Sequence, residues 1–229
     1  MILLLLLLQA TDAHPLSDAQ RATIRKDAET VVADPAASQS ERGDALFKLG
    51  KFAESVTDYE KMLERDPALE KSHWRRGIAL FYAGQYEKAA RQFESYNSYD
   101  NIDRENGIWR YFSQYKAFGK DKAREGLLKY AKDDREPFPD VYQLFEGKRT
   151  PEQILEKIKS AELSEDDREM RSFYANLYIG LNFAVENKPD EARTHLRKAV
   201  ANSWGPKGGY GPNYMWHVGR LHYELLTKK

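Results

Sequence analysis

The feature that most constrains the fold of this chain is an internal repeat. The segment 42–47 is identical to the segment 76–81 at five of six positions, at an offset of 34 residues, and the exception pairs Asp44 with Ile78. The same offset continues downstream, where it pairs Gly50 with Gly84, Phe52 with Tyr86, Ser55 with Ala89, Tyr59 with Phe93 and Asp66 with Asp100. A tandem unit of this length is typical of two-helix units that stack against their neighbours.

Two further stretches extend the pattern. A third unit contains the segment 180–183 with Ala192, Leu196 and Ala199, and a degenerate unit runs from Trp109 to Tyr130 with Gly119, Ala123 and Leu127. Three or more units are enough for a stacked array to bury its faces. In each good unit a glycine, Gly43, Gly77 or Gly180, is predicted to let the two helices approach closely.

Local signals predict an all-helical protein. Ser17, Ser38, Thr150 and Ser164 each precede a Gln, Glu or Asp by three residues, which is the pattern of a helix start. No segment alternates β-branched and polar residues between turns, so we expect no sheet. The predicted helices lie near 18–33, 39–48, 52–65, 69–82, 86–97, 103–117, 121–131, 140–146, 151–160, 166–186, 189–202 and 212–227.

Two stretches break the repeat. Segment 133–139 has two prolines, and segment 204–212 has four glycines and two prolines before a terminal helix that we expect to cap the array. The predicted organisation is a secretory signal segment (1–13), an N-terminal helix (14–35), two repeats (36–102), a degenerate repeat with an irregular helical insert (103–164), a further repeat (165–203), and a Gly-rich loop with a capping helix (204–229).

The N-terminal segment predicts export. Residues 2–8 are uninterrupted apolar residues, and the small residues Ala10 and Ala13 follow them as candidate cleavage points. A run this short cannot span a bilayer as a helix, which takes about 20 apolar residues. No Lys or Arg precedes the run, and the alternative is a buried N-terminal helix. The expected location is periplasmic or secreted, with no membrane span.

Charge and cysteine content exclude several classes of function. Lys plus Arg and Asp plus Glu both number 36, so no overall field draws the chain to nucleic acid or to an anionic membrane. The chain has no cysteine, which excludes disulfides, thiolate metal sites and a cysteine nucleophile. It also removes the residue that would anchor a bacterial lipoprotein.

The repeat residues described above resemble the tetratricopeptide repeat superfamily over roughly residues 36–100 and 172–202. The segments 178–181 and 190–193 are also similar to NlpI-like bacterial envelope proteins. These resemblances imply a short α-solenoid that acts as a scaffold for other envelope proteins and does no chemistry itself. The chain departs from the lipoproteins of that group in lacking the lipidated cysteine.

The resemblance also implies a binding face. In tetratricopeptide arrays the first helix of each unit lines a concave groove, and counting from Glu70 places five residues of the second repeat there. With the matching residues of the degenerate repeat and a neighbouring arginine, the expected partner-binding residues are Lys71, Trp74, Arg75, Ile78, Phe81, Tyr82, Trp109 and Lys116, with Phe112 beside them. The alternative is that this aromatic stripe packs in the core, the commoner role of such a stripe.

No catalytic motif occurs in the sequence, and we expect no enzyme activity, no cofactor and no metal site. His217 and His222 are five residues apart, a spacing that places them on different faces of a helix.

The leading hypothesis is an exported scaffold whose groove binds an extended peptide or a helix of an envelope protein. The rival is a small-ligand binder or enzyme with a pocket between the groove, the loop 204–212, and the terminal helix with Trp216 and His217. Self-association through an end of the array is a third hypothesis.

Overall fold

The protein is all-helical over the part of the chain that the structure describes. The structure, a computed structural model, describes residues 13–132 and 134–228, so the predicted signal segment lies outside the described residues except for Ala13. No strand occurs within those ranges. The helices are α2 (Asp18–Ala33), α3 (Gln39–Lys48), α4 (Phe52–Arg65), α5 (Trp74–Tyr82), α6 (Tyr86–Asn97), α7 (Arg104–Phe118), α8 (Lys120–Glu125), α9 (Phe138–Phe145), α10 (Pro151–Ser160), α11 (Glu165–Val185), α12 (Pro189–Ala201) and α13 (Tyr210–Thr227), with a 3₁₀-helix η1 (Pro67–Lys71).

Three helix pairs share one packing detail. A Cβ built on Gly43 of α3 would lie 2.4 Å from the Tyr59 ring of α4, and one on Gly77 of α5 would lie 2.5 Å from the Phe93 ring of α6. On Gly180 of α11 it would lie 2.8 Å from Leu196 of α12. In each pair the glycine leaves room for a large side chain of the second helix, as the repeat pattern predicts.

The turns between these helices are also alike. A residue with a positive φ follows the first helix of each pair: Gly50 (75°), Gly84 (75°) and Asn187 (59°). The next residue then donates a backbone hydrogen bond of 2.9 Å to the carbonyl five residues earlier. This is a common way to end a helix, and glycine or asparagine is favoured because the left-handed conformation strains most other residues. The repeated register is therefore a property of the structure as well as of the sequence.

The segment predicted as one helix over 69–82 is divided in two. His73 accepts a hydrogen bond from the Arg76 backbone N–H on Nδ1, at 3.2 Å, and so caps the start of α5. The residues before it form η1, which begins at Pro67 after the Asp66 cap. A side chain that satisfies a free N–H at the first turn favours a new helix start at that point.

The helix predicted over 121–131 is shorter than expected. Helix α8 ends at Glu125, and side chains from other helices bind the backbone carbonyls that follow it. Arg110 donates to the carbonyl of Gly126, Tyr142 donates to that of Leu128 at 2.9 Å, and Arg104 donates to that of Lys132 at 2.8 Å. Because these partners replace intrahelical hydrogen bonds, the segment can leave the helix.

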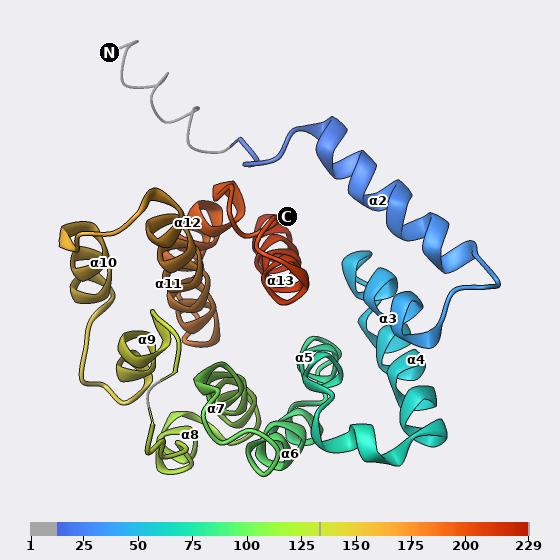
Figure 1. The fold of residues 1–229 in the computed structure, drawn as a ribbon, viewed down its shortest axis with the longest axis horizontal. Helices are drawn as coiled ribbons and strands as arrows, with labels where there is room; N and C mark the ends of the chain where they lie inside the picture. The colour runs from blue at the N-terminus through green and yellow to red at the C-terminus, as the bar shows by residue number, and fades with distance from the viewer. Residues whose placement is uncertain (1–12, 133, 229) are drawn as a thin grey trace.

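Figure 1 shows the helices following a curved path, with α13 lying on the inner side of the curve and α2 along its outside. Helix α13 contacts α3, α11 and α12. Its ring of Tyr214 stacks on Phe47 at 5.0 Å between centroids, and the Tyr82 hydroxyl is 2.9 Å from His222 Nδ1. The terminal helix therefore does more than cap one end of the array. It packs against α3 and α5 on one side of the curve and against α11 and α12 on the other.

Candidate functional site

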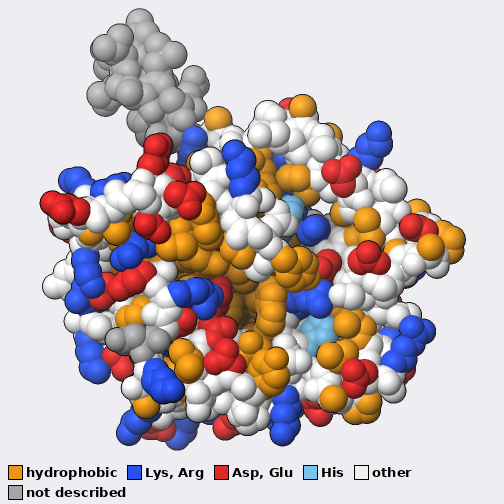
Figure 2. Space-filling model, in the orientation of Figure 1, with side chains coloured by type: hydrophobic (Ala, Val, Ile, Leu, Met, Phe, Trp, Pro, Cys, Tyr) orange, Lys and Arg blue, Asp and Glu red, His pale blue; other side chains and the backbone are white. Residues whose placement is uncertain are grey.

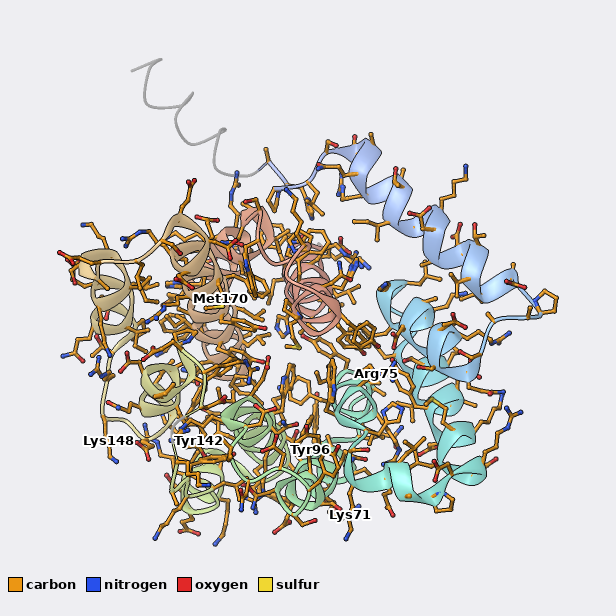
Figure 3. The ribbon with its side chains drawn as sticks, in the orientation of Figure 1. Lys71, Arg75, Tyr96, Tyr142, Lys148 and Met170 are labelled. Carbon is orange, nitrogen blue, oxygen red and sulfur yellow. The ribbon has the colours of Figure 1, made fainter. Side chains whose placement is uncertain are left out.

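A pocket of about 310 Å³ is lined by residues of α5, α6 and α7 on one side and of α11 and α13 on the other. Figure 2 shows hydrophobic side chains gathered around the middle of this face, with acidic and basic side chains beside them. Figure 3 labels Met170 on α11 and Tyr96 on α6, which line the pocket from elements far apart in the chain. The lining residues are Trp74, Ile78, Phe93, Tyr96, Asp103, Glu105, Asn106, Trp109, Met170, Tyr174, Arg135, Trp204, Gly211, Pro212 and Met215.

One part of the lining is aromatic and apolar. Helix α5 contributes Trp74 and Ile78, and α7 contributes Trp109, whose ring packs 5.5 Å from Phe81 and is 1% exposed. The indole Nε1–H of Trp109 is buried without a hydrogen-bond acceptor, and the Tyr178 hydroxyl lies beside it without the geometry of a hydrogen bond. This part of the pocket suits an apolar group of a ligand.

The other part of the lining is polar and forms at the start of α7. Asp103 caps this helix by accepting a hydrogen bond from the Glu105 N–H at 2.9 Å, and its second oxygen accepts one from Asn106 Nδ2 at 2.6 Å. Asp134 accepts a hydrogen bond from the Arg104 N–H at 3.0 Å. Carboxylates at a helix N-terminus bind its free N–H groups and oppose the positive end of the helix dipole, so they are stable there.

Arg135 lies among these carboxylates. Its guanidinium is 2.5 Å from Glu105, 3.2 Å from Asp134 and 3.5 Å from Asp103, and it lies over the Phe138 ring at 4.3 Å. Burial alone would lower the pKa of Arg135, but the surrounding carboxylates outweigh it and raise that pKa. Arg135 is therefore a fixed cation at this end of the pocket.

Glu105 is the titratable group of the site nearest to neutral pH. Burial raises the pKa of its carboxyl to about 7, and Asp103 and Asp134 add to this shift, while Arg135 and the hydrogen bond from Tyr178 oppose it. The Tyr178 hydroxyl on α11 donates that hydrogen bond to Oε1. A carboxyl that changes charge near neutrality inside a pocket is a mark of a functional site.

The predicted partner-binding residues occupy three kinds of position. The core buries Ile78, Phe81 and Trp109. Tyr82 is half-buried, and its hydroxyl lies 2.9 Å from His222 Nδ1 of α13. Trp74 and Arg75 are half-buried beside Tyr210, while Lys71 and Lys116 are exposed, with Lys116 lying 5.7 Å from the Tyr86 ring.

The expectation of one open groove formed by all eight residues is wrong for this structure. Phe81 and Tyr82 face inward as the repeat pattern predicts, but α13 and neighbouring rings cover them. The physical reason is the apolar surface of α13 itself, where Tyr214, Met215, Val218 and Leu221 are all buried. Only Trp74, Ile78 and Trp109 of the predicted set come together at the pocket.

The rival hypothesis placed a pocket between the groove, the loop 204–212 and the terminal helix. Trp204, Gly211 and Pro212 of that loop do line the pocket. Trp216 and His217 do not: the Trp216 indole donates to the Val200 carbonyl at 3.0 Å, and His217 is buried beside Arg220. No histidine is among the lining residues.

Sequence reasoning missed the polar residues of the pocket, namely Asp103, Glu105, Asn106, Arg135 and Tyr174. Asp103 has a local signal, because it lies directly before a helix and can cap it. Arg135 lies in the segment identified only as a break in the repeat. Nothing in the local sequence places that segment beside the start of α7.

A scan against models of known protein families finds no match. Among the described residues no group of three or more His, Asp or Glu side chains is arranged to hold a metal ion. No helix in the same ranges is both long enough and apolar enough to cross a membrane.

Proposed function

We propose that this protein binds a small organic ligand in the pocket between α5, α7, α11 and α13. The observation that carries the proposal is the pocket itself, about 310 Å³ in volume, with aromatic walls and a charged end built from segments far apart in the sequence. This volume is at the lower end of the range of about 300–1,000 Å³ that is usual for ligand pockets. Apolar walls with a few converging polar groups are also the usual composition of such sites.

In this proposal the helix pairs are repeats of the tetratricopeptide type, and they form the shell that positions the pocket. The glycine contacts between α3 and α4, α5 and α6, and α11 and α12 support that assignment, as do the three like turns. The degenerate unit differs at the packing position, where Tyr111 stands 34 residues after Gly77 and is 2% exposed. The Tyr111 ring packs there against Phe145 of α9, at 5.1 Å between ring centroids.

The proposal is tested by closing the pocket with one side chain. Gly211 lines the pocket, and a Cβ built on it meets no atom within 4 Å, so the position accepts a side chain. Gly211→Leu adds bulk at the pocket wall, and Gly211→Ala is the matched control. A panel of small molecules is assayed by thermal unfolding and tryptophan fluorescence. A ligand at 100 times its Kd stabilises the wild type by about 2.7 kcal/mol, and we expect Gly211→Leu to lose this gain. A ligand of the panel that stabilises Gly211→Leu as much as the wild type would show that it binds outside this pocket.

A second candidate function is the exported scaffold that binds a protein of the cell envelope. The observation that favours it is a rim beside the pocket where Tyr210 is 58% exposed, with Trp74 at 6.5 Å and the Arg75 guanidinium at 5.4 Å from its ring. Tyrosine, tryptophan and arginine are the residues that most often anchor protein interfaces.

The scaffold is tested by affinity capture from an envelope extract with the wild type and with Tyr210→Ala. We expect Tyr210→Ala to lose the captured protein while staying folded, with a loss of about 1–2 kcal/mol of stability because its hydroxyl no longer donates to the buried Asp44 carboxylate. Capture that is unchanged by the substitution would contradict a role for this rim. Mass spectrometry of the native protein tests export separately, through the loss of residues 1–13.

A further inference from the structure

We propose that the ligand of this pocket is an organic cation, a small molecule with an alkylammonium group held between the aromatic walls and the carboxylates at the start of α7. The inference rests on the proposed function and names its ligand class. It is drawn from the balance of charge at the polar end, from the rings of the walls and from the hydrogen bonds already made there.

The balance of charge at the polar end disfavours an anion. Asp103, Glu105 and Asp134 surround one guanidinium, that of Arg135, within 3.5 Å. Arg135 therefore already has three acidic partners, and a ligand carboxylate or phosphate would compete with them for it. An added positive charge would meet more negative than positive groups.

The walls suit a cation for a second reason. Trp74, Trp109, Trp204, Tyr96 and Tyr174 all line the pocket. The faces of such rings carry partial negative charge and attract alkylammonium groups, most strongly where water is excluded. Several tryptophans and tyrosines with carboxylates at one end are the composition of an aromatic cage. A neutral apolar ligand would use the area of these rings but not the carboxylates.

The burial of Glu105, which raises the pKa of its carboxyl, makes cation binding sensitive to pH. The groups that face this carboxyl are Arg135 and Asp134 on the segment before α9, Asp103 at the N-cap of α7, and Tyr174 and Tyr178 on α11. Since the pKa of Glu105 is raised to about 7, its carboxyl carries a proton in about half of the free molecules at neutral pH. A bound cation favours the ionised carboxylate, so binding is expected to strengthen as the pH rises through 7.

The test uses choline, whose charge does not change with pH, and its neutral isostere 3,3-dimethylbutan-1-ol, with butyrate as the anionic probe. Binding is measured by calorimetry and by the fluorescence of the pocket tryptophans at pH 6 and pH 8. We expect choline to bind at least about tenfold more tightly than the neutral isostere at pH 8, and butyrate to bind more weakly than both. We also expect the affinity for choline to rise by roughly tenfold from pH 6 to pH 8.

Two variants separate the carboxylate from the rings. Glu105→Gln keeps the shape of the side chain, and it should weaken choline binding and remove its pH dependence while leaving the neutral isostere unchanged. Glu156→Gln, at a carboxylate on α10 that is 68% exposed, is the matched control. Trp204→Leu keeps apolar area but loses the ring, so it should weaken choline more than the isostere. Thermal unfolding confirms that each variant is folded.

The inference is overturned if the neutral or anionic probe binds as tightly as choline, if Glu105→Gln leaves choline binding unchanged, or if choline does not bind at all. The proposed function is judged separately by the wider panel with Gly211→Leu. A neutral or anionic ligand that stabilises the wild type and not Gly211→Leu would support a binding pocket while excluding a cation as its ligand.

Discussion

The Tyr178 hydroxyl on α11 donates a hydrogen bond to the Glu105 carboxylate on α7. The other carboxylate oxygen is held by Arg135 at 2.5 Å. One side chain thus joins two helices and the segment before α9, and the hydrogen bond from Tyr178 favours its ionised form. Glu105 is for this reason both a structural contact between the two halves of the curve and the most pH-sensitive group of the pocket.

Tyr178→Phe should remove this hydrogen bond and leave the ring in place. We expect the free energy of unfolding to fall by about 1–2 kcal/mol, because a buried acceptor loses its donor. The pKa of Glu105 should rise further above about 7, since its charged form loses a stabilising contact. Urea unfolding and a carbon NMR titration of the carboxyl measure the two effects. Tyr99→Phe, at a ring that is 66% exposed, is the control, and a pKa of Glu105 that does not move would contradict the assignment.

Glu105 should make the protein less stable as the pH rises. Its pKa is about 7 in the folded protein and near the ordinary 4.5 when unfolded, so the folded state keeps a proton that the unfolded state releases. The stabilising effect of that proton is complete below about pH 4.5 and is lost as the pH rises through 7. One pKa unit corresponds to 1.36 kcal/mol, so folded and unfolded pKa values of about 7 and 4.5 give a full effect of about 3 kcal/mol.

The measurement is the difference in unfolding free energy between the wild type and Glu105→Gln at pH 5 and pH 8. The comparison is needed because burial lowers the pKa of His73 and His222 to about 4, which changes stability with the opposite sign between pH 4 and 6.5. We expect the wild type to lose about 2–3 kcal/mol relative to the variant over this range. Parallel curves for the two proteins would show that Glu105 titrates normally.

Gly77→Leu should overpack the contact between α5 and α6. A Cβ at this position already lies 2.5 Å from the Phe93 ring, so the longer side chain must push the helices apart. We expect a loss of about 1–3 kcal/mol, measured by thermal or urea unfolding. Gly211→Ala is the comparison, because a Cβ there meets nothing within 4 Å and stability should change little. An unaltered Gly77→Leu midpoint would mean that this helix pair is packed differently.

Trp74→Ala tests whether this residue belongs to the core or to a binding surface. Its ring packs 5.1 Å from Tyr214 and the residue is half-buried, so truncation should cost about 2–3 kcal/mol, less than the roughly 3–5 kcal/mol of a fully buried tryptophan. Trp74→Phe should recover most of this loss by filling the space. A wild-type melting temperature together with lost ligand or partner binding would instead place the indole on the surface that binds.

Helix positions in this protein follow closely from local sequence signals. The capping boxes at Ser17, Ser38 and Thr150 are present in the structure, and the helices after them begin where those residues predict. At Ser164 the cap is present as well, with the hydroxyl accepting from the Asp167 N–H. These contacts join residues three positions apart, so the sequence alone contains the information that they need.

The packing within each helix pair was also predictable, because the glycine and the large side chain that covers it stand at the same spacing in all three good units. The candidate site was predictable only in part. Trp74, Ile78 and Trp109 follow from the repeat pattern, whereas Arg135 and Glu105 meet through a connection that follows no repeat. A periodic pattern identifies which face of a helix is apolar, but not which distant segment will cover it.

The sequence by itself determined the all-helical class of the described residues, most of the helix boundaries and the register within the pairs, because caps, turns and packing glycines act over short distances. The tertiary structure alone decided that α13 lies inside the curve, since its contacts join residues far apart in the chain, such as Tyr82 with His222 and Asp44 with Tyr210. That placement covers the face that was expected to be an open groove. It leaves the pocket beside Glu105 because the side chains of α13 do not fill the space between α5, α7 and α11.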